Sequence, residues 1–244
     1  MALADILYRQ GFGTRRLCAG LIAQGQVQVD GAVCDDPQAG FAMQGLPLVV
    51  QGQPWLCQVS AYLMLHKPAG IECSQRPSAW PCVYTLLPAP LRHRPRRGGV
   101  AGVQAVGRLD QDTTGLLLLT DDGGFIHRMA SPRHHVPKVY RVTLRHDASP
   151  ELCTRLMEGV VLDDDPQPVR AAACDLAGER SLVLTLTEGK YHQVKRMVAA
   201  AGNRVEALHR ERIGDLHLPA DLVPGQWRWL SDDDLRAVGY TRQA

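Results

Sequence analysis

The most uniformly apolar stretch of the chain is a run of four leucines at positions 116–119. Bounded by polar residues, a run of this length predicts a buried β-strand, because it is too short for a lone helix or a membrane span. The preceding segment, 106–115, is polar and concentrates a cation, two carboxylates and two hydroxyls. A polar cluster beside a core strand predicts a site held on a rigid element, although a solvated turn between strands has the same composition.

The apolar pattern near the N-terminus predicts a small separate unit over residues 1–55. A short helix begins at Leu3 and stops at Gly11, and a second, with Thr14 as N-cap, ends at Gly25. Two valine-containing segments around an Asp-Gly turn at 30–31 then predict a β-hairpin. Residues 51–54 are predicted to be a linker to the rest of the chain.

Strand and helix patterns alternate irregularly over residues 60–244. Strands are predicted at 62–67, 141–144, 169–176 and 181–187, and helices at 124–130, 150–159 and 188–202. This order predicts an α+β domain built on a mixed, largely antiparallel sheet with flanking helices. Residues 88–99 are rich in proline, glycine and arginine and are predicted to be irregular, either as a mobile basic loop that reaches for phosphates or as a plain disordered insertion.

Composition places the 244-residue chain among ordinary globular proteins, with 45% hydrophobic and 21% charged residues. Aromatic residues make up only 5%, which argues against a wide base-stacking surface. The formal net charge of +2 is uninformative, but the charges are segregated along the chain. Basic residues gather at 92–97 and 190–212, and acids at 163–165 and 232–234. Such segregation predicts a positive face suited to nucleic acid.

The seven cysteines form no Cys-x-x-Cys pair, and the nine histidines include no His-Glu-x-x-His spacing. We therefore expect free thiols in a reducing cytoplasm and no metal site. The first residues lack the charged-then-apolar order of a signal peptide, and no segment has the length and apolarity of a membrane span.

Two chemistries fit the letters of the polar segment but not its surroundings. Asp110, Asp112 and Thr114 match the Asp-x-Asp-x-Thr pattern of phosphatases with an aspartate nucleophile, yet Gly107 and Arg108 interrupt the apolar strand that should precede it. The same residues match a calcium loop, which needs flanking helices rather than a leucine strand.

A third match extends along most of the chain. Gly107-Arg-Leu-Asp110, the following Thr-Thr-Gly-Leu-Leu and Thr120-Asp-Asp-Gly123 resemble the catalytic motif of the RNA pseudouridine synthases. Three further segments, at 62–70, 138–140 and 188–197, resemble other motifs of these enzymes in the same order. The wording at 131–135 and 208–214 resembles the small-subunit rRNA branch. Residues 1–50, with Arg15 and Arg16 opening the second helix, resemble the S4 RNA-binding module.

This resemblance implies roles for individual residues. Asp110 would be the nucleophile, Lys195 the cation against it, and Tyr140 the ring that stacks on the target base. The target base would have to leave its stack in the RNA helix to reach Asp110, and Arg108 would fill the gap that it leaves. RNA contacts are expected from the remaining residues of the matching motifs and the S4-like unit, namely Lys67, Lys138, His192, Arg196, Arg15 and Arg16. Asp112 and Thr113 are expected to hold the turn.

The expected activity is isomerisation of one uridine in small-subunit rRNA, with neither a cofactor nor a metal, because a carboxylate can begin the reaction by itself. The expected partner of this monomer is ribosomal RNA or a ribosome assembly intermediate, and no membrane. A non-catalytic RNA-binding or assembly factor remains the alternative. The discriminating residue is Asp110, since an aspartate in a basic RNA cleft repels phosphate and is of use only to an enzyme.

Overall fold

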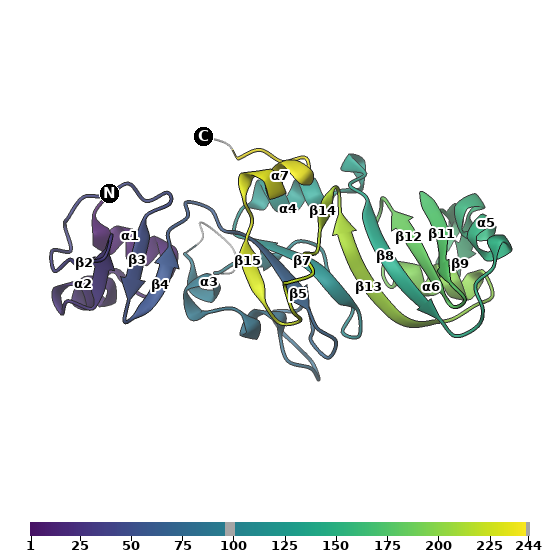
Figure 1. The fold of residues 1–244 in the computed structure, drawn as a ribbon, viewed down its shortest axis with the longest axis horizontal. Coiled ribbons are helices and arrows are strands. Elements are labelled where there is room, and N and C mark those ends of the chain that lie inside the picture. Colours follow the sequence, from purple (N-terminus) through teal and green to yellow (C-terminus); the bar gives the residue numbers. More distant parts are fainter. Residues whose placement is uncertain (96–100, 243–244) are drawn as a thin grey trace. The chain divides into compact units, whose positions relative to one another are not determined.

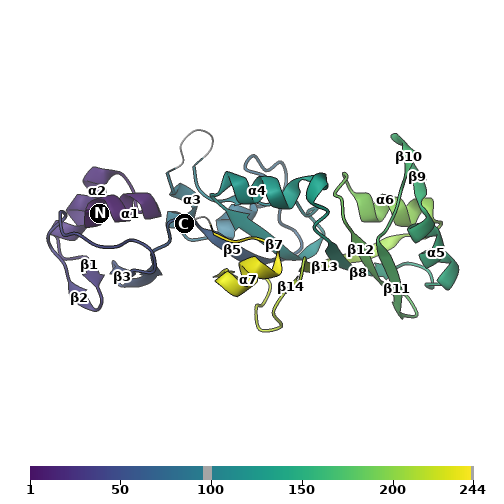
Figure 2. The same cartoon turned by 90° about the horizontal axis from the view of Figure 1, so that it is seen from above.

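The computed structural model describes residues 1–95 and 101–242 (Figures 1 and 2). The chain divides into two compact units, each of which takes residues from several parts of the sequence. Unit 1 comprises Met1–Tyr62, Leu87–Gln104 and Leu119–Asp122. Unit 2 comprises Leu63–Leu86, Ala105–Leu118 and Gly123–Ala244.

Unit 1 begins with the two predicted helices, α1 (Leu3–Gln10) and α2 (Arg15–Ala23). Thr14 caps α2 by accepting a hydrogen bond from the backbone N–H of Leu17 (3.3 Å), as the sequence predicts. A sheet of order β2-β1-β3-β4 follows. Its strands are β1 (Val27–Val29), β2 (Ala32–Val33), β3 (Pro47–Val50) and β4 (Gln53–Leu56). The hairpin at the Asp-Gly turn is confirmed.

The linker predicted at 51–54 is wrong. Gln51 and Gly52, with φ angles of 51° and 78°, make the tight turn between β3 and β4. Pro54 lies within β4, whose only partner among the described strands is β3. The sequence misled because proline is usually a strand breaker, whereas an edge strand tolerates a missing donor.

The prediction of an irregular loop over 88–99 is also wrong in part. Residues Ala89–His93 form helix α3, which packs against the end of α1. The close approach depends on Gly11, with φ of 94°, because a Cβ there would lie 2.1 Å from the carbonyl oxygen of Pro90. Arg96 and Arg97, part of the predicted basic loop, lie outside the described residues.

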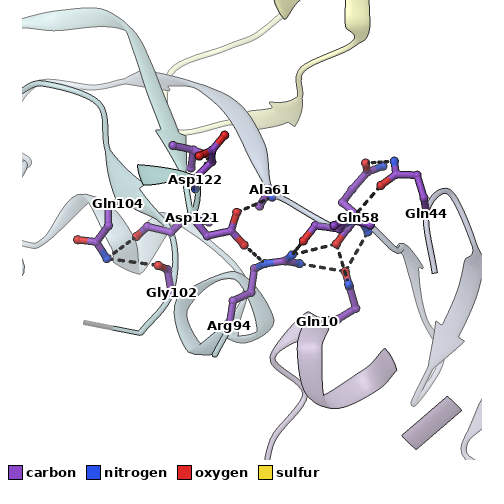
Figure 3. Close-up of polar contacts among 12 residues, drawn as sticks. Gln10, Gln44, Gln58, Ala61, Arg94, Gly102, Gln104, Asp121 and Asp122 are labelled. Atoms are coloured by element: carbon purple, nitrogen blue, oxygen red, sulfur yellow. Dashed lines mark hydrogen bonds and ion pairs between the residues drawn. The ribbon is translucent and has the colours of Figure 1, made fainter. Parts of the chain in front are cut away.

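Arg94, which directly follows α3, is buried rather than free to reach phosphate (Figure 3). Its Nε donates to Asp121 Oδ2 (2.6 Å), and its Nη1 donates to Gln10 Oε1 on α1 (3.0 Å). Its Nη2 donates to the carbonyl oxygens of Gln58 and Val59 (2.9 and 3.0 Å). A single guanidinium therefore joins α1, the segment after β4 and the residue that follows β7 within unit 1.

Unit 2 is organised around a mixed sheet of order β11-β12-β8-β13-β7-β5-β15, to which β14 and β6 add pairs. The pairs β11–β12, β12–β8, β8–β13 and β5–β15 are antiparallel, and β13–β7 is parallel. The strands are β5 (Tyr62–Lys67), β6 (Gln104–Ala105), β7 (Thr114–Thr120), β8 (Lys138–Leu144), β11 (Ala173–Gly178), β12 (Ser181–Leu186), β13 (Val205–Ile213), β14 (Leu216–His217) and β15 (Trp227–Trp229).

The leucine run forms the centre of β7, and each of the four side chains has an exposed fraction of 0%. Complete burial of a leucine contributes about 1.5–3 kcal/mol, so this strand is a firm base for the loop before it.

Helices α5 (Pro150–Glu158) and α6 (Gln193–Ala200) pack with strands β8, β11 and β12 around one hydrophobic core (Figure 2). The short hairpin β9 (Val160–Leu162) and β10 (Asp165–Val169) adds to that core. The remaining helical segments of the unit are α4 (Gly123–Ala130), α7 (Asp232–Ala237) and the 3-10 turns η1 (Val83–Leu86) and η2 (Pro132–His134).

The predicted α+β class with a mixed, largely antiparallel sheet is confirmed. Two boundaries are wrong. The single strand predicted at 169–176 is split between β10 and β11, and the helix predicted from 188 begins only at Gln193. Within the described ranges, no helix is both long and apolar enough to cross a membrane.

Candidate active site

A cleft of about 570 Å³ opens in unit 2 between the loop before β7, the strands β8 and β13, and the start of α6. Among the predicted site residues, those that line it are Asp110, Arg108, Tyr140, Lys138 and His192. The structure thus brings together side chains that lie more than 80 positions apart in the sequence.

Backbone contacts hold the loop that carries Asp110. The Thr113 N–H donates to the Asp110 carbonyl oxygen (3.1 Å), which closes a tight turn, and the Gly70 N–H donates to the Gln111 carbonyl (3.0 Å). The buried ammonium of Lys67 donates to the carbonyls of Pro68, Gln111 and Thr113 at 2.8–3.1 Å. The loop is therefore positioned by the strand β5 on which Lys67 lies.

The carboxylate of Asp110 faces an ammonium and an imidazole from the α6 region. Lys195 Nζ lies 3.1 Å from Oδ2, and His192 Nε2 lies 3.4 Å from Oδ1. The Asp110 side chain keeps an exposed fraction of 26%, so it is accessible from the cleft while paired. This is the pairing that the sequence predicted for Lys195.

Asp112 is a partner of the same lysine, which sequence reasoning missed. Its Oδ1 accepts a hydrogen bond from Lys195 Nζ at 2.6 Å, closer than the Asp110 contact. Burial lowers the pKa of Lys195, but the bonds to Asp112 and Asp110 outweigh it and leave that pKa raised. Burial raises the pKa of Asp112, and the Lys195 bond outweighs it and leaves it lowered. The i, i+2 spacing of the two aspartates was the available signal.

His192 reaches Asp110 from a left-handed backbone conformation (φ 48°) at the N-cap of α6, not from within the helix as its sequence pattern predicted. Gln193 fixes this turn, accepting from the Lys190 N–H (2.7 Å) and donating to Glu188 (3.0 Å). The adjacent Tyr191 stacks on the His192 ring, with centroids 3.8 Å apart, and is 71% exposed on the cleft lining. Sequence reasoning did not single out Tyr191.

The opposite wall of the cleft is provided by β8 and β13. Tyr140 is half-buried there, and Arg210 Nη1 lies 3.5 Å from its hydroxyl oxygen. Lys138 also lines this wall, and burial followed by the nearby charge of Arg210 lowers its pKa. Arg210 belongs to a basic cluster in the sequence, but its place in the cleft was not predicted.

Two residues expected to contact RNA are engaged elsewhere. Lys67 has an exposed fraction of 0%, and burial lowers its pKa. Because its ammonium is occupied by three carbonyls, direct contact with RNA does not fit this geometry. Arg196 forms an ion pair with Asp164 and donates from Nη1 to the Tyr191 carbonyl (3.2 Å).

The remaining predicted contacts are exposed side chains. Arg108 lies on the cleft lining, and Arg16 is the second residue of α2 in unit 1. Arg15, also on α2, pairs with Asp5 (2.9 Å) and lies over the Tyr8 ring. No group of three or more histidine, cysteine or acidic side chains within the described part of the chain is arranged to hold a metal ion.

Comparison with known proteins agrees with this geometry. Residues 61–200 match the family described as RNA pseudouridylate synthase, and residues 1–39 match the S4 domain. The chain belongs to the RNA pseudouridylate synthase family. The phosphatase and calcium-loop interpretations of the Asp110 segment are therefore set aside.

Two members of the family resemble the chain over most of its length. A "Ribosomal small subunit pseudouridine synthase A" from Yersinia pestis is 41% identical over 215 residues, 88% of this chain and 86% of that protein. One of the same name from Escherichia coli (strain K12) is 39% identical over 241 residues, 96% of this chain and 98% of that protein.

A solved structure described as a pseudouridylate synthase has 32% sequence identity and a TM-score of 0.67. The match covers 98% of this chain and 99% of the chain in that structure. The resemblance therefore includes both the S4-like residues and the cleft.

Proposed function

We propose that this family member isomerises a uridine of small-subunit rRNA to pseudouridine. The observation that carries the proposal is the cleft itself, in which the accessible carboxylate of Asp110 is paired with Lys195 and faces Tyr140 on the same lining. The names of the two relatives described above support the choice of substrate. A non-catalytic RNA-binding factor has no use for this arrangement.

Asp110 is the proposed nucleophile. Breaking the glycosidic bond, turning the uracil and rejoining it through carbon five needs an attacking group but no cofactor. The lysine and histidine contacts stabilise the ionised carboxylate before attack. Attack on the anomeric carbon of the sugar and attack on the uracil ring both remain compatible with this role.

Tyr140 is proposed to stack on the uracil, and its hydroxyl to assist removal of the proton from carbon five. A base within a helix cannot reach Asp110, so the nucleotide must leave its stack, which costs a few kcal/mol. Arg108, exposed at the cleft and two residues before Asp110, is proposed to occupy the gap.

The RNA is proposed to lie along the cleft lining, where Lys138 and His192 offer polar contacts and Tyr191 a stacking face. Arg196 contributes once its ion pair with the exposed Asp164 opens, and Lys67 acts indirectly, through the Asp110 loop. Residues 1–55 are proposed as an RNA-binding domain acting through Arg15 and Arg16, beside a catalytic domain over 60–244.

We further propose a monomer that works in the cytoplasm on ribosomal RNA or a ribosome assembly intermediate. The test is to incubate the enzyme with naked small-subunit rRNA, with partly assembled small-subunit particles and with large-subunit rRNA. Pseudouridines are then mapped by chemical tagging and reverse transcription. A single new pseudouridine in small-subunit rRNA, naked or in particles, is expected. Modification confined to large-subunit rRNA would contradict the substrate assignment.

A further inference from the structure

Two buried side chains of the cleft lining carry polar atoms that no described residue satisfies. They are the hydroxyl Oγ1 of Thr113, which is 1% exposed, and Nη2 of Arg210, which is 3% exposed. Buried polar groups are nearly always hydrogen-bonded, so such atoms in a cleft need a partner that a water or a ligand supplies.

Arg210 is held rigidly on β13. Its Nε donates to the Leu116 carbonyl oxygen on β7 (2.8 Å), and its cross-strand partner on β8 is Tyr140. Gly115 on β7 permits this approach, because a Cβ there would lie 2.3 Å from the Arg210 carbonyl oxygen. With Nε and Nη1 directed at fixed partners, the planar guanidinium leaves Nη2 in one orientation.

The charge of Arg210 has no counter-ion among the described residues, since its polar contacts are to a carbonyl and a phenol oxygen. Lys138 on the same lining adds a second positive group nearby. A permanently charged guanidinium in a buried position is costly without a partner. The chemistry of this wall therefore favours a ligand with negative charge or strong acceptor oxygens.

We propose that Arg210 Nη2 donates a hydrogen bond to a carbonyl oxygen of the flipped uracil and stabilises the negative charge that the reaction places on it. This inference rests on the proposed function. A phosphate would stay at the entrance, because the RNA chain continues on both sides of the target, whereas the base is the part that enters deeply. Arg210 is among the least exposed residues of the lining.

The charge appears by either route of attack. When an Asp110 oxygen bonds to the anomeric carbon, the glycosidic bond breaks and its electron pair remains on the uracil, shared between the ring nitrogen and the two carbonyl oxygens. When it bonds to carbon six of the ring, the π pair of the carbon five–carbon six bond forms a new π bond between carbons four and five, and the π pair of the carbonyl at carbon four moves onto its oxygen. A preorganised donor at that oxygen acts as an oxyanion hole does.

The first arm of the test compares Arg210→Met and Arg210→Lys with Arg141→Met as a matched control. Arg141 is exposed on β8, pairs with Glu211 and does not line the cleft. Loss of one oxyanion donor typically costs about 10²–10³ in rate, so Arg210→Met should lower the single-turnover rate by that factor. Its dissociation constant for RNA should stay unchanged, Arg210→Lys should recover part of the rate, and the control should match the wild type.

The second arm uses RNA with 2-thiouridine or 4-thiouridine at the target, because sulfur is a poorer acceptor than oxygen. One of the two should slow the wild type and slow Arg210→Met much less, which is the non-additivity expected of a direct contact. Equal slowing of both enzymes by both analogues would overturn the inference, as would full activity of Arg210→Met. If Arg210→Met fails to fold, as judged by thermal unfolding, Arg210→Lys carries the same comparison. No product from the wild type on unmodified rRNA would instead overturn the proposed function, and this inference with it.

Discussion

At the scale of single residues, the centre of the site is one ammonium shared by two carboxylates. Lys195 contacts Asp110 at 3.1 Å and Asp112 at 2.6 Å, and the Asp112 side chain is the more exposed of the two acids. Asp112 thus keeps Lys195 charged and in place, and its own side chain does not line the cleft. The sequence predicted the contact between Asp110 and Lys195, because each lies in a recognisable motif. It did not predict the contact of Lys195 with Asp112, since that pairing depends on how the loop turns.

This sharing predicts a pH effect. The pKa of Lys195 is raised above the ordinary lysine value of 10.5. The side chain therefore keeps its charge at every pH below that ordinary value and loses it only as the pH rises through the raised pKa. Asp112→Asn removes a contact that raises this pKa, so the alkaline loss of single-turnover activity should move to lower pH. At neutral pH the rate should fall by no more than about fivefold, as expected for an exposed ion pair.

The matched variant is Lys195→Arg, whose guanidinium keeps its charge throughout the alkaline range and should remove the alkaline loss. Rates measured across that range with all three proteins test the account. An alkaline limb at the same pH for Asp112→Asn and the wild type would show that Asp112 does not act on Lys195.

At the scale of elements, what the sequence predicted well is what local chemistry determines. The caps of α1 and α2, the Asp-Gly hairpin and the leucine strand follow from propensity and periodicity. The failures are α3, β4, the division of residues 169–176 between β10 and β11, and the late start of α6. Arg94 is an example. The sequence around it predicts a basic loop, yet the side chain is buried and hydrogen-bonded to Asp121, Gln10 and two carbonyl oxygens.

The Arg94 contacts predict a large stability difference between two arginines of one helical segment. Arg94→Met leaves the largely buried Asp121 carboxylate without its ion-pair partner, and breaking such a pair costs about 3–5 kcal/mol of the free energy of unfolding. Arg92→Met, at an exposed position of α3, should change it by no more than about 0.5 kcal/mol. Urea unfolding measures both, and equal effects would contradict the structural role of Arg94.

At the scale of the whole molecule, the order of the motifs predicted an α+β synthase with an S4-like unit at its N-terminus, because each motif marks a particular strand end or turn of the fold. The arrangement of the cleft was less accessible to sequence. Lys67 was expected to contact RNA, and Arg210 belongs to a basic stretch of the sequence, yet both side chains are buried. Lys67 supports the loop from beneath, whereas Arg210 lines the cleft. Charge alone could not separate these two roles, because burial is set by the packing of β5, β7 and β13.

The most direct test of the account is release of tritium from small-subunit rRNA transcribed with uridine labelled at carbon five. Pseudouridine formation must expel that hydrogen, since the new glycosidic bond is made at the same carbon. The wild type should release about one equivalent per RNA, and Asp110→Asn should release none. Equal release by Asp110→Asn would contradict the nucleophile. Absence of release by the wild type, on naked rRNA and on assembly particles alike, would contradict the enzyme.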